Sequence, residues 1–200
     1  MAIPTDTTAW VSGALDHDQA LVARTCAGER GAFEQLFARY QTRIHRLALG
    51  LLGDAEEAQD ATQDAFVRAY RQLRSFRGDS AFLTWLYRIA VNQCLTRLRK
   101  RRRAAEAMLS VGRDLPVTTD GVAERAVEVQ RVREVVNLLS PAYRVVLVLR
   151  FWHELSLQEI ADVTGSTAPQ VKMRLHRARK AFARRYLADA GSVATLGSWA

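Results

Sequence analysis

No proline occurs between Asp16 and Arg103, and this long proline-free stretch constrains the fold more than any other feature of the sequence. Proline disrupts a helix interior because it lacks an N–H donor and clashes with the preceding turn, so its absence permits long helices. Apolar residues recur at helical spacing in this stretch, as in Phe33, Leu36, Phe37, Tyr40, Ile44 and Leu47. Because no segment shows the alternating pattern of a strand, we predict an all-α protein.

The helical periodicity divides into two parts. Residues 16–103 and residues 123–187 are each expected to hold four helices. Between them, residues 104–122 lose the periodicity and gather glycine and proline, which is typical of a linker. Residues 188–200 are small and polar and are expected to form a flexible tail. We therefore predict two small helical domains joined by a flexible linker.

Several helix ends carry local signals. Gly53 followed by Asp54 predicts that one helix ends and the next is capped there, since glycine tolerates the left-handed backbone and Asp accepts from free N–H groups. Ser140-Pro141 is expected to start another helix. Ser156 and Glu159 have the spacing of a capping box.

The charge of the chain points to a polyanionic partner. The formal net charge is +8, and the basic residues gather in two clusters. Six of the seven residues 97–103 are Lys or Arg, as are seven of the fifteen residues 171–185. Cations at a helix C-terminus also favour the helix dipole, but that accounts for one or two charges per helix, so we expect both clusters to contact phosphates.

The segment from Ser156 to Arg179 has the layout of a helix-turn-helix, a short capped helix followed by a longer one across a glycine-containing turn. An apolar stripe on the longer helix is expected to pack inward. The outward face is suited to the major groove, where Arg reads guanine and an amide reads adenine. Its residues are Gln170, Lys172, Met173, His176, Arg177 and Lys180. The alternative is a helical hairpin with a solvated basic face.

A second surface is predicted on the last helix of the first part. Trp85, Arg88, Asn92, Thr96 and Arg99 fall on one face, opposite an apolar stripe that includes Tyr87. Aromatic, amide and cationic groups together suit unpaired bases. The preceding turn adds Phe76, Arg77 and Ser80, and Phe76 with Asn92 could form the stacking wall and the amide of a pocket for an extruded base. The alternative is that Phe76 and Trp85 are core residues.

Residues 54–64 are acidic, with Asp54, Glu56, Glu57, Asp60 and Asp64. Acids in the first turn of a helix are expected from its dipole, but Asp60 and Asp64 lie beyond that turn. An acidic face should avoid DNA, so it favours a basic protein partner.

Catalytic and metal-binding patterns are missing from the sequence. The four histidines pair with no nucleophile or metal-ligand spacing, and Cys26 and Cys94 are far apart. We expect no cofactor, no metal, no small-molecule substrate and no enzymatic activity. No signal peptide or membrane span is apparent, so a cytoplasmic location is predicted.

Taken together, three segments resemble the extracytoplasmic-function sigma factors of bacterial RNA polymerase, the sigma-E-like group of the sigma-70 family. Residues 75–92 (SFRGDSAFLTWLYRIAVN) resemble their promoter-melting region. Residues 54–70 (DAEEAQDATQDAFVRAY) resemble their polymerase-binding helix. Residues 139–165 (LSPAYRVVLVLRFWHELSLQEIADVTG), with VKMRLHRARK after them, resemble their reader of the upstream promoter element.

The resemblance implies a role for each surface. Asp60, Gln63 and Asp64 would contact core RNA polymerase, and Phe76 and Asn92 would capture the flipped base of the minus-ten element. The minus-thirty-five element would be read by Arg150, Lys172, Met173, His176 and Arg177. Residues 16–103 would then be sigma region 2 and residues 123–187 sigma region 4.

The partners so implied are core RNA polymerase, promoter DNA and an anti-sigma factor that controls a stress or envelope response. Two alternatives remain open on the residues alone. A stand-alone helix-turn-helix regulator would explain the second part of the chain but not the acidic helix, and an RNA-binding helical protein would prefer structured RNA.

Overall fold

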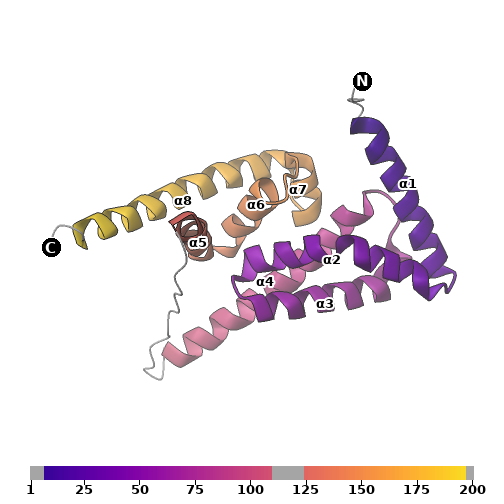
Figure 1. Cartoon of the computed structure of the whole chain (residues 1–200), viewed down its shortest axis with the longest axis horizontal. Coiled ribbons are helices and arrows are strands. Elements are labelled where there is room, and N and C mark those ends of the chain that lie inside the picture. The colour runs from indigo at the N-terminus through magenta and orange to yellow at the C-terminus, as the bar shows by residue number, and fades with distance from the viewer. Residues whose placement is uncertain (1–6, 110–123, 197–200) are drawn as a thin grey trace.

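The computed structural model describes residues 7–109 and 124–196, and in those ranges every regular element is a helix (Figure 1). The all-α prediction is therefore confirmed. The elements are α1 (Thr7–Cys26), α2 (Arg30–Leu52), α3 (Ala55–Gln72), a short 3-10 helix η1 (Leu73–Ser75), α4 (Phe82–Leu109), α5 (Glu124–Asn137), α6 (Pro141–Phe151), α7 (Leu157–Thr164) and α8 (Ala168–Leu196).

The local signals for helix ends are confirmed at all three places. Gly53 ends α2 with a left-handed backbone at φ 74°, and the Asp54 carboxylate accepts from the Glu57 N–H at 2.8 Å. Ser156 and Glu159 form a complete capping box at the start of α7. Pro141 is the first residue of α6, but the Ser140 side chain makes no capping hydrogen bond, so proline rather than serine sets this start.

Three helix boundaries differ from the sequence predictions. The first helix begins at Thr7 rather than near Asp16. The fourth, α4, continues to Leu109, so the first six residues of the predicted linker are helical and residues 110–122 lie outside the described residues. The last, α8, continues to Leu196, so most of the predicted flexible tail is helical and residues 197–200 lie outside the described part.

Helices α1 to α4 form the first part of the fold around a core that includes Leu36, Ile44, Leu47 and Phe82. Helix α1 is joined to α2 by a buried carboxylate. Asp18 is 4% exposed, and its carboxylate accepts from Arg39 Nη1 at 2.6 Å and from the Tyr40 hydroxyl. Both carboxylate oxygens are thus satisfied, as a buried charge requires.

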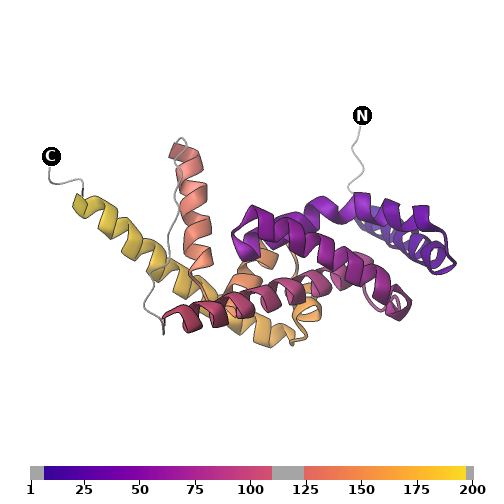
Figure 2. The same ribbon diagram turned by 90° about the horizontal axis from the view of Figure 1, so that it is seen from below.

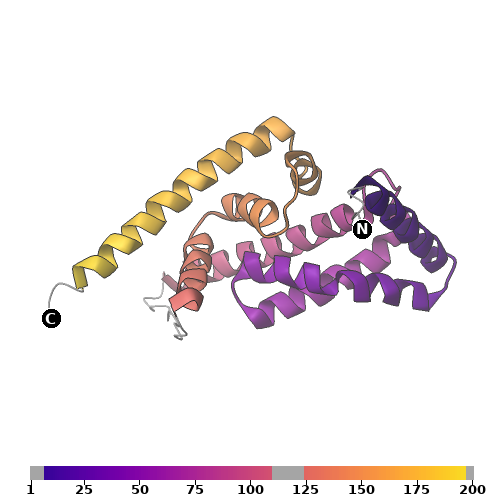
Figure 3. The same ribbon diagram turned by 45° about the horizontal axis from the view of Figure 1, so that its top comes forward.

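Helices α5 to α8 pack directly on the first part rather than standing apart from it. Helix α7 lies against α4, and α6 lies against α2. The C-terminal half of α8 extends away from this body, and α1 lies at the opposite end of the molecule in each view (Figure 1, Figure 2, Figure 3). One buried apolar cluster therefore includes residues from both parts of the chain.

Candidate functional site

Three surfaces carry the residues that the sequence singled out. None of them lines a metal centre, since the described residues include no group of three or more His, Cys, Asp and Glu side chains suited to a metal ion. Nor is any helix in residues 7–109 and 124–196 long and apolar enough to cross a membrane.

The first surface lies on α4 and the turn before it. Arg88, Asn92, Thr96 and Arg99 are all exposed along one face of the helix. The Thr96 hydroxyl donates to the Asn92 backbone carbonyl at 2.8 Å, and the Asn92 side chain itself is exposed. An exposed amide between two cations can hydrogen-bond an unpaired base while the cations contact phosphates.

An aromatic cluster lies at the N-terminal end of this face. The rings of Phe76 and Trp85 are half-buried, with centroids 5.4 Å apart, and both pack against buried Phe82 at 5.7 Å. Both rings thus pack against the core and keep part of their surface exposed. Arg77 beside them is exposed and Ser80 is half-buried.

The second surface lies on α3, where Asp60, Gln63 and Asp64 are exposed. Arg97 of α4 reaches across to this helix, with Nη2 2.5 Å from an Asp64 oxygen and Nη1 3.9 Å from an Asp60 oxygen. The two acids nevertheless keep more than half of their side-chain area exposed, 63% for Asp60 and 56% for Asp64. They remain accessible to a basic partner, and Arg97 fixes their position.

Sequence reasoning missed these pairs because it assigned the whole basic run 97–103 to phosphate contact. Arg97 pairs with α3, and Arg101 lies 3.6 Å from the Glu57 carboxylate and donates to the Leu52 carbonyl at 3.2 Å. Two of the basic side chains in this run are thus used inside the first part of the fold. Only the spacing of acids and bases on facing helices could have suggested it.

The third surface lies on the first half of α8. Lys172, Met173, His176, Arg177 and Lys180 are exposed, as predicted from the helical period. The opposite stripe is turned inward, with Val171 and Ala178 buried and Leu175 and Phe182 half-buried. The basic face therefore belongs to a helix that is held firmly by α6 and α7.

Two reciprocal hydrogen bonds between Thr167 and Gln170 stabilise the turn before α8. The Gln170 Oε1 atom accepts from the Thr167 N–H at 3.1 Å, and the Gln170 N–H donates to the Thr167 hydroxyl at 3.4 Å. The side-chain oxygen of Gln170 thus takes part in capping the helix. The same amide was predicted to read adenine, and its NH₂ group remains available to a base. Arg150 also has a structural contact, since Nη1 donates to the Leu155 carbonyl at 2.8 Å.

Both parts of the chain match known protein families. Residues 36–104 match the sigma-70 region 2 family, and residues 129–182 match the sigma-70 region 4 family. The RNA polymerase sigma-H factor of Pseudomonas aeruginosa is 37% identical over 83% of this chain and 92% of its own length. The ECF RNA polymerase sigma factor SigW of Bacillus subtilis is 35% identical over 81% of this chain and 92% of its own length.

A solved structure shows the same fold. The sigma factor RpoE of Bartonella quintana, in complex with the anti-sigma factor NepR, superimposes with a TM-score of 0.63 and 25% identity. The alignment covers 78% of this chain and 96% of the RpoE chain. The likeness therefore extends over both helical parts.

Proposed function

The chain belongs to the extracytoplasmic-function sigma factors of the sigma-70 family, and from this we propose that it binds core RNA polymerase and directs it to a defined set of promoters. Residues 16–103 would serve as region 2, for polymerase binding and minus-ten recognition, and residues 123–187 as region 4, for the minus-thirty-five element. The polymerase catalyses RNA synthesis, so the chain itself is not an enzyme. The chain acts in the cytoplasm.

The observation that carries the proposal is the presence of two unlike nucleic-acid surfaces in one chain. The α4 face combines Asn92 and exposed arginines with the half-buried rings of Phe76 and Trp85, which suits unpaired bases. The α8 face presents cations on a helix that follows a capped turn, which suits the major groove. A factor that both locates and melts duplex DNA needs both kinds of surface.

The polymerase contact is assigned to the exposed acids of α3. Asp60 and Asp64 lie on the side of α3 that faces Arg97, and Gln63 is exposed between them. Electrostatic complementarity with a basic polymerase element would set the orientation of region 2 and speed association. The nucleic-acid face on α4 would remain free in that complex.

A protein inhibitor is the natural regulator of such a factor. The RpoE structure contains an anti-sigma factor bound to a chain of the same fold. We extend that partner class to this chain, in a response to stress or envelope damage. No small-molecule substrate is required by any part of this mechanism.

The alternative is a stand-alone helix-turn-helix regulator, and gel-shift assays on promoter duplexes separate the two. The chain alone is expected to bind weakly, and the chain with core polymerase is expected to form a promoter-specific complex. Strong sequence-specific binding by the chain alone, unchanged by added polymerase, would support the stand-alone regulator instead. A preference for structured RNA over promoter DNA would point to an RNA-binding protein.

A further inference from the structure

Helix α1 lies beside the minus-ten surface, by which we mean the Asn92 face of α4 and the turn of residues 76–80 before it. Leu21 and Val22 of α1 are buried in the apolar core, and the helix contacts η1 and α4 as well as α2. The match to the sigma-70 region 2 family begins only at residue 36. What α1 adds to this surface is therefore a question for the structure and not for the family match.

A buried carboxylate sets the rotation of α1 about its own axis. Asp18 accepts from Arg39 Nη1 at 2.6 Å and from the Tyr40 hydroxyl, and both donors belong to α2. Removing either partner would leave a buried charge uncompensated, which is strongly destabilising. Helix α1 therefore cannot turn without breaking this contact, and the direction of the next residue, Gln19, is set with it.

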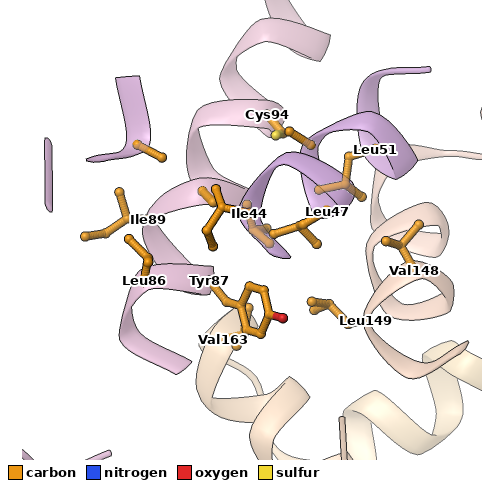
Figure 4. Packing of buried hydrophobic residues seen from close by; sticks show 14 of the residues in the cluster. Ile44, Leu47, Leu51, Leu86, Tyr87, Ile89, Cys94, Val148, Leu149 and Val163 are labelled. Carbon is orange, nitrogen blue, oxygen red and sulfur yellow. The ribbon is translucent and has the colours of Figure 1, made fainter. Parts of the chain in front are cut away.

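The same contact is connected to the stacking ring of the surface. The Tyr40 ring packs against Phe82 with centroids 5.8 Å apart, and Phe82 packs against Phe76 at 5.7 Å. One turn further along α4, Leu86 is fully buried in one cluster with Ile44 of α2 (Figure 4). The anchor of α1 and the Phe76 ring thus belong to one packed body.

Gln19 itself lies over Gly78, in the middle of the turn. A Cβ atom on Gly78 would lie 3.6 Å from Gln19 Nε2, and the backbone there is left-handed with φ 78°, which favours glycine. Gln19 is exposed, and its amide has no hydrogen-bond partner within residues 7–109 and 124–196. An amide with free donors and a free acceptor is thus held against the turn, next to exposed Arg77.

This amide lies close to the place where an extruded base would stack. Gly78 follows Phe76 by two residues, so their Cα atoms are at most about 7.6 Å apart, at about 3.8 Å per residue. Successive stacked bases are about 3.4 Å apart. The amide is therefore within one or two nucleotides of a base on Phe76, and an amide can both donate to and accept from a base edge.

We propose that Gln19 is a further base-reading residue of the minus-ten surface, which selects an unpaired base beside the one held by Phe76 and Asn92, and that Asp18 positions it. The inference rests on the proposed function, because it names another residue of the same surface. The alternative is that Gln19 only supports the turn. Support of the turn would affect all promoters alike, whereas base reading affects one position of the element.

Run-off transcription with core polymerase, on a promoter library randomised over the minus-ten element and its flanks, separates the two. Asn92→Ala, profiled on this library, identifies the position of the captured base. Gln19→Ala should lower the base preference at a position within two nucleotides of it by about fivefold or more, and should leave the other positions unchanged. The matched control is Gln41→Ala, the same change at an exposed position of α2, which should keep the wild-type profile.

Gln19→Glu gives a sharper result, because a carboxylate accepts hydrogen bonds but cannot donate them. Preference at the Gln19-dependent position should move toward cytosine, whose N4 amino group is a donor. A side chain that only supports the turn would not change which base is preferred. Alanine and glutamate both favour a helix as well as glutamine does or better, so neither variant weakens α1 through its helix propensity.

Asp18→Asn tests the positioning residue, since it removes the charge but keeps the size of the side chain. It should lower the preference at the Gln19-dependent position, and it should add nothing to the effect there when combined with Gln19→Ala. An unchanged preference in Asp18→Asn would refute its positioning role.

Two results would overturn the proposal for Gln19. One is a wild-type profile in both Gln19→Ala and Gln19→Glu, and the other is a uniform loss of transcript with an unchanged profile. If the wild-type chain directs no transcript at all, the proposed function itself is refuted. That result differs from normal wild-type transcription with a base preference that ignores Gln19.

Discussion

The Tyr87 hydroxyl and the Nδ1 atom of His153 form a hydrogen bond of 2.9 Å that joins α4 to the turn after α6. The two rings also meet edge to face, with centroids 5.2 Å apart. Burial raises the pKa of Tyr87 to about 12 and lowers the pKa of His153 to about 4. The contact between region 2 and region 4 therefore holds a neutral histidine.

This pair predicts a loss of stability in mild acid. The positive charges of Arg43 and Arg46 reinforce the effect of burial on His153, while Glu154 and Glu159 line the same pocket of the interface. Since an unfolded histidine binds a proton near pH 6.5 and native His153 binds one near pH 4, the unfolded state holds more protons between these values. The free energy of unfolding should fall as pH drops through this window, by less than about 1.4 kcal/mol per pH unit.

Urea titrations at several pH values measure this slope. His153→Gln keeps a hydrogen-bonding side chain toward Tyr87 but cannot titrate, so its stability should depend less on pH between 4 and 6.5 than that of wild type. His17→Gln, at an exposed position on α1, serves as control and should keep the wild-type slope. An unchanged slope in His153→Gln would contradict the assignment.

Asn92→Ala should impair promoter melting and leave polymerase binding intact. The amide is exposed on the α4 face, whereas the polymerase contact is assigned to α3. Loss of a base contact costs about 1–3 kcal/mol, so the open complex should fall by roughly five- to 150-fold. Permanganate reactivity of unpaired thymines measures melting, and co-elution measures polymerase binding. Gln93→Ala, on the adjoining side of the helix, is the matched control, and weakened co-elution of Asn92→Ala would show that the face is misassigned.

Asp64→Asn should weaken polymerase binding by about tenfold, because it removes an exposed charge from the α3 surface. Arg97→Gln breaks the same ion pair from the other side and leaves the acid in place. Its affinity for polymerase should be at least that of wild type, and both variants should lose under about 1 kcal/mol of stability. Equal loss of affinity in the two variants would mean that the pair only braces α3 against α4.

Gln170→Ala and Thr167→Ala separate capping from base reading on α8. Each variant breaks one of the two reciprocal hydrogen bonds at the start of the helix, because each bond joins one residue's side chain to the other's backbone N–H, and each should cost about 1 kcal/mol of stability. Only Gln170→Ala removes an amide that can reach adenine, so only it should relax preference within the upstream element. Selection from a randomised promoter library measures that preference, and identical profiles for the two variants would leave Gln170 a capping residue alone.

Local features of the fold could be predicted from the sequence because they depend on neighbouring residues. Gly53 with Asp54 and Ser156 with Glu159 mark helix ends through contacts within four residues. The C-terminal ends of α4 and α8 were predicted too early, because the prediction followed the apolar periodicity. Residues 104–109 are mostly alanine and other strong helix formers, so α4 continues beyond the basic run even though the periodicity fades.

Contacts between distant residues could not be predicted. The exposed faces of α4 and α8 that carry the proposed DNA contacts follow from the helical period, and the structure leaves both exposed. The partners of Arg97, Tyr87 and Arg144 lie 33, 66 and 93 residues away in the sequence. Such pairings depend on how the helices pack against one another. The apolar periodicity of a single helix does not specify that packing. The interface between the two regions is therefore a finding of the structure alone.

The most direct test of the account is run-off transcription with purified core RNA polymerase on a library of promoter templates. Core polymerase with the wild-type chain should give transcripts from a small subset of templates with a shared pair of upstream elements, and core polymerase alone should give none of them. If no template yields a transcript that depends on the chain, the assignment of promoter-selecting function is contradicted.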